Sequence, residues 1–267
     1  MQPPPRQEKN EGQDKMLGPL PNGKFYNFFI DDNIFFFTDI AREKPASLFD
    51  HFYLANLRRA HREYGVKFTL NTFYHNWHEP GFDLSQFPER YRAEFEDNAD
   101  WLRLAFHGFS EFPERPYSEA YPEKFAEHYG SWESAVTRIA GAATVTPPVI
   151  FHYFDAVPEV RRHMRARGMK FFTLRSGDGI VRNDEFDQYE IPLDIFLNRL
   201  GSDLAGLRKI LSAKIAAGQK MLLVGSHEQY AYPRYPRFIP EYFDGVFMTC
   251  RLLAENGYTP AYFNDLA

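Results

Sequence analysis

Short apolar runs alternate with amphipathic segments along the chain from residue 23 onwards. Runs rich in aromatic and β-branched residues predict strands, and they lie at 25–30, 66–74, 101–107, 149–154, 170–174, 189–193 and 220–224. Apolar residues at helical spacing predict helices at 47–64, 88–98, 122–140, 158–167, 202–217 and 241–256. This alternation predicts one parallel α/β domain of the barrel type.

The N-terminal segment differs in composition from the rest of the chain. Its first residues are rich in Pro, Gln and charged side chains, and they lack the apolar stretch of a signal peptide. We therefore expect residues 1–22 to form a flexible arm and residues 23–267 to form a single domain, because no linker or repeat interrupts the pattern. No apolar stretch reaches the length of a membrane span, which favours a cytoplasmic location.

Composition excludes several classes of partner and site. The formal net charge of −5 predicts no basic surface, so we expect no nucleic-acid partner. The single cysteine, Cys250, excludes an internal disulfide and a thiolate metal cluster, and its apolar neighbours predict a buried thiol. The aromatic fraction of 17% is high, and such rings either pack against sugars or fill a core.

Polar residues follow several predicted strands at the point where each apolar run ends. Asp31 and Asp32 come after the first strand, His107 ends the third, His152 lies in the fourth and His227 follows the seventh. In a barrel these ends meet at one rim. Adjacent carboxylates repel each other unless a cation or a shared proton compensates. The pattern is therefore typical either of a solvated turn, which Asp-Asp-Asn also favours, or of a site for a divalent metal such as zinc.

Three segments carry a resemblance to a known family: Phe29-Ile30-Asp31-Asp32, the run 106–111 that begins Phe-His, and 222–228, which ends in His-Glu. With them the chain resembles the polysaccharide deacetylases, the NodB-homology or carbohydrate esterase family 4 group, and looks closest to its divergent members. The resemblance implies a distorted (β/α) barrel and a divalent metal, usually zinc. It also implies removal of N- or O-acetyl groups from sugars.

The family motifs imply a role for each matching residue. Asp31 corresponds to the general base and Asp32 to a metal ligand. His227, in the last motif, corresponds to the general acid.

The second family motif has two metal-binding histidines, and only the first is matched. His107 takes that position, whereas Glu111 stands where the second histidine is expected. The third ligand is therefore either Glu111 or His152, and we prefer His152 because its predicted strand end faces the same rim.

Further segments offer contacts to a substrate. Arg115 and Tyr117, after the second motif, are candidates to line the groove. The arginine-containing third motif has no clear match, and the choice between Asp178 and Asp194 as an orienting carboxylate stays open. The aromatic and basic run 230–237 either covers the mouth of the site, binds an anionic glycan, or is a surface loop shaped by its prolines.

The resemblance implies a metal-dependent deacetylase whose partner is an acetylated carbohydrate, either a polysaccharide or its precursor. Two other functions stay open. One is a catalytically inactive barrel that binds carbohydrate, because Glu111 departs from the motif. The other is a metal-dependent hydrolase of a non-sugar amide, because a fold alone does not determine the substrate.

Overall fold

The computed structural model describes residues 19–113, 116–117 and 122–267. Its larger sheet has the strand order β3-β2-β1-β8-β7, and β9 pairs with the beginning of β1. These strands are β1 (Phe25–Asn33), β2 (Phe68–Phe73), β3 (Leu102–Gly108), β7 (Ile195–Phe196), β8 (Met221–His227) and β9 (Thr259–Pro260). All pairs are parallel, so β1, β2, β3 and β8 end at the same edge of the sheet.

A second, smaller sheet has the strand order β4-β6-β5. It contains β4 (Phe171–Leu174), β5 (Val181–Asn183) and β6 (Gln188–Pro192). The segment between β3 and β4 connects the sheets, because Leu104 accepts a hydrogen bond from Thr146 and Val149 accepts one from Thr173. On the other side, the Asp194 N–H donates to the Leu223 carbonyl of β8. The mostly parallel α/β architecture predicted from the sequence is confirmed.

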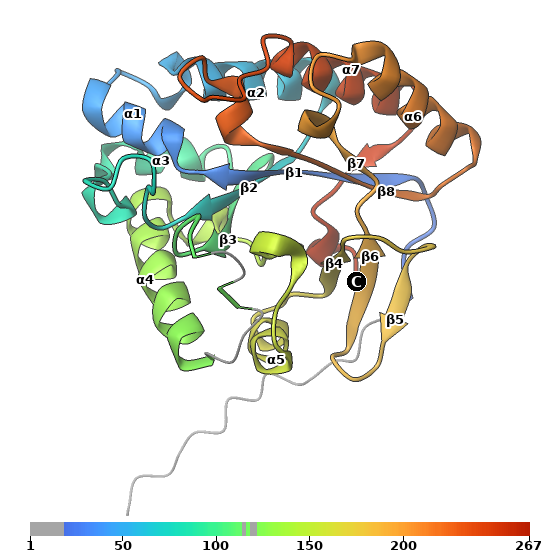
Figure 1. Cartoon of the computed structure of the whole chain (residues 1–267), viewed down its shortest axis with the longest axis horizontal. Coiled ribbons are helices and arrows are strands. Elements are labelled where there is room, and N and C mark those ends of the chain that lie inside the picture. Colours follow the sequence, from blue (N-terminus) through green and yellow to red (C-terminus); the bar gives the residue numbers. More distant parts are fainter. Residues whose placement is uncertain (1–18, 114–115, 118–121) are drawn as a thin grey trace, which may run out of the picture.

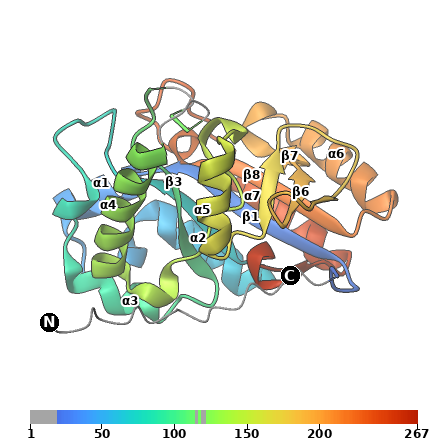
Figure 2. The same cartoon turned by 90° about the horizontal axis from the view of Figure 1, so that it is seen from below.

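Helices cover both sides of the strand layer. They are α1 (Phe35–Glu43), α2 (Phe52–Tyr64), α3 (Arg92–Glu96), α4 (Pro122–Ala140), α5 (Pro158–Ala166), α6 (Leu204–Ala216) and α7 (Tyr242–Glu255). In Figure 1, α2, α6 and α7 lie along one side of the larger sheet, whereas α4 and α5 lie on the other. Figure 2 shows α4 and α5 next to each other in front of the strands. The predicted helices are present, with shorter bounds at several ends.

Local sequence explains the turn that precedes α2 and the end of the helix. Ser47 caps a 3-10 turn (Leu48–Asp50), with its side chain accepting the Phe49 N–H and the Asp50 side chain accepting the Ser47 N–H. This reciprocal pair satisfies backbone donors that a helix start leaves free. Gly65 ends the helix with φ of 68°, a left-handed conformation that glycine adopts without a steric penalty.

One predicted strand is absent, and one helix was not predicted. Residues 149–154 form no strand: residues 152–154 make a 3-10 turn in which Tyr153 and Phe154 have φ of 64° and 61°. Left-handed residues cannot continue an extended strand. Helix α1 was not predicted: it begins two residues after β1 ends, and its residues from Phe35 to Ile40 are all buried.

Most of the aromatic content fills the core. Phe28, Phe68, Phe36 and Trp132 are fully buried, and the rings of Phe28 and Phe68 lie with their centroids 5.1 Å apart. Cys250 is also fully buried, as predicted, and burial raises the pKa of its thiol. The high aromatic fraction is therefore chiefly a property of the packing.

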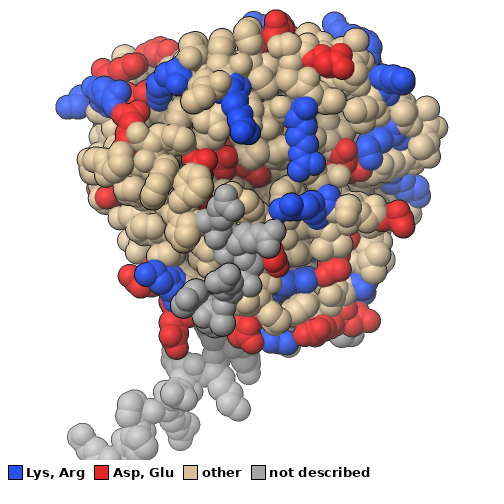
Figure 3. Space-filling view, in the orientation of Figure 1, with Lys and Arg blue, Asp and Glu red and all other residues tan. Residues whose placement is uncertain are grey.

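Charged side chains on the surface are mixed in sign. On the face drawn in Figure 3, basic and acidic residues are interspersed. Many arginines have a carboxylate partner, as in the pairs Arg59–Glu63 and Arg92–Glu96, each at 3.0 Å. Exposed pairs of this kind contribute only ~0–1 kcal/mol each, so they add little to the stability of the fold.

Candidate metal centre and active-site cleft

The ends of β1, β3 and β8 bring predicted site residues to one edge of the sheet. Asp31 in β1 is the register partner of His227 in β8, and His107 is the penultimate residue of β3. Asp32 has φ of 61°, and the register between β1 and β2 shifts at this point. A left-handed aspartate breaks the alternation of the strand, and both aspartates line the same cleft of about 410 Å³.

His152 reaches this cleft from the 3-10 turn that precedes α5. The two residues after it are in the left-handed region, which is uncommon for residues other than glycine. Such conformations persist where the surrounding structure holds them, and they cluster at functional sites. The turn therefore places the His152 imidazole beside the strand ends, although His152 itself does not belong to a strand.

Asp32, His107 and His152 form a compact cluster of ligand atoms. Asp32 Oδ1 lies 3.2 Å from His107 Nε2 and 3.8 Å from His152 Nδ1, and the two ring nitrogens lie 3.1 Å apart. One ligand atom from each residue lies within 4.8 Å of the others, and all three residues are buried. One carboxylate oxygen and two imidazole nitrogens are a donor set that zinc and similar divalent ions prefer.

The hydrogen bonds and protonation of the cluster fit a cation. His152 Nε2 lies 2.9 Å from the Glu111 carbonyl oxygen, so this nitrogen carries the proton and Nδ1 presents its lone pair to the cluster. Burial lowers the pKa of His107 to about 3 and that of His152 to about 4, so both rings are neutral at pH 7. Asp32 Oδ1 is buried and has no hydrogen-bond partner among the described residues. A buried acceptor without a donor is costly, and a cation would satisfy it.

Asp31 lies beside the cluster in a buried environment. Asn71 donates a hydrogen bond of 2.7 Å to Asp31 Oδ1, and His107 Nδ1 lies 3.7 Å from the same oxygen. Burial and the neighbouring Asp32 raise the pKa of Asp31 well above its usual value, although the Asn71 hydrogen bond opposes this. A carboxyl group with a raised pKa accepts a proton more readily near neutral pH.

His227 faces the cluster from the end of β8. Its Nδ1 lies 3.2 Å from Asn198 Oδ1, so this N–H donates to the amide oxygen. Its Nε2 lies 3.4 Å from Asp32 Oδ2. Burial lowers the pKa of His227 to about 4, so the ring is neutral at pH 7 and Nε2 is free to take up a proton.

Comparisons with known proteins support the fold. No protein-family model and no curated protein matches the sequence. Among solved structures, the Bc1960 peptidoglycan N-acetylglucosamine deacetylase, in complex with 4-naphthalen-1-yl-N-oxidanyl-benzamide, matches with a TM-score of 0.53 at 12% identity, over 92% of this chain and 90% of that chain. The chain has the polysaccharide deacetylase fold.

Two further structures agree with this assignment. A Mycobacterium smegmatis protein assigned to the polysaccharide deacetylases has a TM-score of 0.51 at 14% identity, over 92% of this chain and 96% of that one. The catalytic domain of the peptidoglycan N-acetylglucosamine deacetylase from Eubacterium rectale has a TM-score of 0.50 at 13% identity, with 91% of each chain covered. The resemblance that the motifs indicated is thus confirmed at the level of the fold. The sequence identities of 12–14% agree with a sequence that has diverged far from those of these structures.

Glu111 lines the cleft but does not belong to the cluster of Asp32, His107 and His152. Its carboxylate lies 2.5 Å from His78 Nε2 and accepts a hydrogen bond of 3.0 Å from Gln229. Burial raises the pKa of Glu111, but the hydrogen bond with His78 and the other interactions lower it by more, so the pKa lies below its usual value. Only its main-chain carbonyl touches a cluster residue, His152. The compact cluster of ligand atoms thus contains His152 and not Glu111.

Neither of the two candidate substrate-binding residues is seen to line the cleft. Arg115 lies outside the described residues. Tyr117 is 2% exposed and does not line the cleft; its hydroxyl accepts the Phe109 N–H and lies 3.1 Å from His128 Nδ1. In this structure Tyr117 supports the residues that follow β3.

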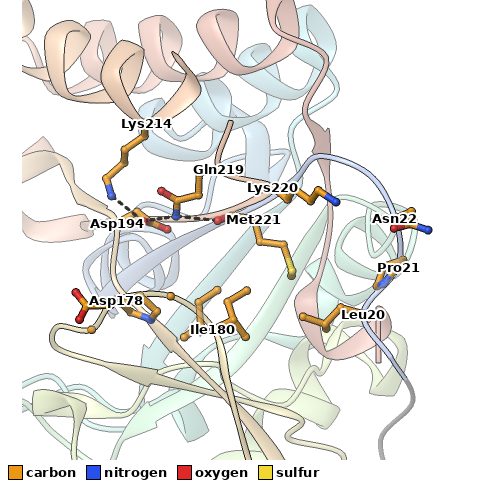
Figure 4. Close-up of a pocket in the computed structure, with 14 residues that line it drawn as sticks. Leu20, Pro21, Asn22, Asp178, Ile180, Asp194, Lys214, Gln219, Lys220 and Met221 are labelled. Carbon is orange, nitrogen blue, oxygen red and sulfur yellow. Dashed lines mark hydrogen bonds and ion pairs between the residues drawn. The ribbon is translucent and has the colours of Figure 1, made fainter. Parts of the chain in front are cut away.

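Neither of the two candidate orienting carboxylates lines the cleft. Both line a separate cavity of about 550 Å³, shown in Figure 4. There Asp194 accepts hydrogen bonds from Lys214, Gln219 and the Leu223 N–H, so its side chain is satisfied within the fold. Asp178 lies in the exposed turn on the opposite wall.

Glu228, directly after His227, is a buried residue whose role the sequence did not reveal. Its carboxylate accepts the N–H groups of Ile34, Phe35 and Phe36 at 2.7–2.9 Å, and the Tyr232 hydroxyl at 2.8 Å. Burial raises the pKa of Glu228 to about 7, and these hydrogen bonds oppose the rise. A carboxylate from the end of β8 thus holds the start of α1, just after the aspartates of β1.

Side chains from distant segments complete the walls of the cleft. Phe154, Phe196, Tyr230 and Tyr235 supply aromatic surface, and Arg175, Arg199 and Arg237 supply positive charge. Sequence reasoning indicated only the run 230–237 as a possible cover of the mouth. The other segments carry no motif, and only the tertiary structure brings them together.

In the described part of the chain, no helix is long and apolar enough to cross a bilayer.

Proposed function

We propose that the protein is a divalent-metal-dependent deacetylase that removes N- or O-acetyl groups from a carbohydrate. The observation that carries this proposal is the Asp32–His107–His152 cluster with Asp31 directly beside it. The deacetylase fold supports it, and the named activities of the structural neighbours agree with it. Aromatic walls of the cleft would pack against the apolar faces of sugar rings.

Asp32, His107 and His152 would hold the metal, and we propose zinc because the ligands combine two imidazoles with a carboxylate. When bound, such an ion acts as a Lewis acid on a carbonyl and lowers the pKa of water. The three protein ligands come from β1, β3 and the turn before α5. A catalytic site of this kind keeps a position open for water or substrate.

Asp31 and His227 would move the protons of the hydrolysis. Asp31 accepts a proton from water as the water oxygen attacks the acetyl carbonyl. The C–N or C–O bond then breaks, and the leaving amine or alcohol needs a proton. Because the His227 ring is neutral at pH 7, the proton it delivers must be taken up during the reaction. The proton removed by Asp31 is the available source, and Asp31 and His227 are register partners on adjacent strands.

Replacing Asp31 by Asn tests the proposed base. We expect Asp31→Asn to lower acetate release from N-acetylglucosamine oligomers or acetylated xylan by about 10²–10⁴-fold, since this is the usual contribution of a general base. The matched control is Asp178→Asn, an exposed aspartate outside the cleft, which should retain activity. Near-normal hydrolysis by Asp31→Asn would refute the assignment.

A further inference from the structure

Three arginines from three separate segments line the active-site cleft. Arg175 follows β4, Arg199 ends the 3-10 turn (Leu197–Arg199) before α6, and Arg237 belongs to the loop before α7. All three residues are exposed. They lie 24 and 38 residues apart in the sequence, so the tertiary structure alone gathers their charges at one place.

These arginines have no carboxylate partner among the described residues, in contrast to many others in the chain. Arg234, in the same loop as Arg237, donates to Asp39 at 2.8 Å, and Arg161 pairs with Glu190 at 2.9 Å. An arginine that serves only the fold is commonly satisfied in this way. The cleft arginines therefore keep their positive charge available to a ligand.

Each of the three side chains is positioned by an aromatic neighbour. The Arg175 guanidinium lies 5.5 Å from the Phe154 ring centroid and that of Arg199 lies 5.4 Å from the Phe196 ring centroid. Arg237 interacts with the Tyr230 side chain, and this raises the pKa of the arginine. Arg175 Nη2 also donates a hydrogen bond of 3.3 Å to the Tyr153 carbonyl oxygen. These neutral neighbours restrain each guanidinium without neutralising its charge, and a guanidinium has five N–H donors, so donors remain for an anion.

Glu111, one of the three acidic residues that line the cleft, already has partners. The Glu111 carboxylate contacts His78 and Gln229, so it does not offset the arginines directly. The other two carboxylates, Asp31 and Asp32, are buried. The cleft thus has carboxylates buried within it and positive charge on exposed side chains.

We propose that the cleft recognises an acetylated carbohydrate that bears an anionic group, a carboxylate or a phosphate, bound by Arg175, Arg199 and Arg237. This inference rests on the proposed deacetylase function and narrows its substrate class. The arginines attract the anionic group and the buried carboxylates repel it. The anionic group stays at the mouth, and a neighbouring neutral acetyl group is directed inward.

The test compares probes that share an acetylated hexosamine and differ in charge. They are tri-N-acetylchitotriose as the neutral probe, a hyaluronan tetrasaccharide as the carboxylate probe, and N-acetylglucosamine 1-phosphate as the phosphate probe. Binding to the metal-loaded protein is measured by calorimetry at low and high salt, and acetate release is followed separately. The two anionic probes distinguish a carboxylate from a phosphate as the recognised group.

The variant carries Arg175→Gln, Arg199→Gln and Arg237→Gln together, and Arg208→Gln on α6 is the matched control. Arg208 is also exposed but lies outside the cleft. We expect at least one anionic probe to bind wild type about tenfold more tightly than the neutral one, given a few-fold contribution from each exposed charge pair. The triple variant should lose this preference, and salt should weaken it.

The outcomes separate this inference from the proposed function. Anionic preference that disappears in the triple variant but persists in Arg208→Gln supports the inference, even if no probe is hydrolysed. Equal binding of neutral and anionic probes, a preference that survives in the triple variant, or no binding of any probe overturns it. Hydrolysis of the neutral probe without anionic preference would refute the inference and leave the deacetylase function intact.

Discussion

At the scale of single residues, the hydrogen bond from Asn71 to Asp31 is one of three effects on the protonation of the proposed base. Asn71 donates to Asp31 Oδ1 at 2.7 Å and so stabilises the charged carboxylate. Burial and Asp32 act in the opposite direction and raise the pKa of Asp31. The balance of these effects determines the pH below which the base becomes protonated.

Replacing Asn71 by Ala should therefore shift the pH dependence of activity. Loss of the hydrogen bond raises the pKa of Asp31 further, so the base becomes protonated at a higher pH. We expect the acidic limb of the kcat/KM profile to move to higher pH. Asn27→Ala is the control, because Asn27 is a buried asparagine of β1 that bonds to Ala261 away from the cleft. An unchanged acidic limb in Asn71→Ala would contradict this account of Asp31.

The residue scale also shows what the sequence could predict about the site. Asp31, His107 and His227 lie at ends of parallel strands, so alternation and strand polarity were enough to group them. His152 was placed on a strand, yet it reaches the cluster through left-handed residues that no hydrophobic period reveals. The three cleft arginines lie in loops, whose convergence depends on the whole fold.

At the scale of elements, Glu228 connects β8 to the start of α1. Three backbone N–H groups of the first turn bind its carboxylate, and no side chain of the residue before α1 caps the helix. The segment after β1, the strand in which the aspartates lie, is therefore held by an acid that directly follows the neighbouring strand β8. This interaction escaped sequence reasoning because the capping group lies almost two hundred residues away along the chain.

Glu228→Ala should destabilise the protein strongly. It leaves three buried N–H donors without an acceptor, and each such loss costs about 1–3 kcal/mol. We expect the free energy of unfolding to fall by about 3 kcal/mol or more in denaturant titrations. Glu255→Ala, at the exposed end of α7, should change stability by less than about 0.5 kcal/mol. A stability for Glu228→Ala equal to that of this control would contradict the capping role.

The order of elements was more predictable than their details. Most strands and helices followed from apolar periodicity, with Gly65 and Ser47 marking boundaries by their usual chemistry. Helix α1 was missed because it has only nine residues and begins with three phenylalanines, and a short apolar run does not distinguish a helix from a strand. The false strand at 149–154 failed because a short apolar run does not distinguish a strand from a buried turn.

At the scale of the whole molecule, the proposed metal would join segments that are distant in the sequence. Its ligands come from β1, β3 and the turn before α5. A ligand that binds the folded state but not the unfolded chain stabilises the protein by mass action. Metal binding should therefore be measurable as stability as well as activity.

Removal of the metal by a chelator should lower the unfolding temperature. A free metal concentration of a thousand times Kd contributes about 4 kcal/mol, and each kcal/mol corresponds to about 2–4 °C for a domain near this size. Adding zinc back should restore the midpoint. Asp32→Ala should melt at the same temperature with and without chelator, and equal sensitivity in the variant and the wild type would contradict the proposed ligand.

The most direct test of the central claim is the metal content of the purified protein, measured by plasma mass spectrometry before and after reconstitution with zinc. Wild type should hold about one divalent ion per chain, as a three-ligand site requires. His61→Ala, on α2, should do the same, whereas Asp32→Ala and His152→Ala should lose the ion. A wild type that neither contains nor takes up zinc, or ligand variants that keep it at the wild-type level, would contradict a metal-dependent deacetylase.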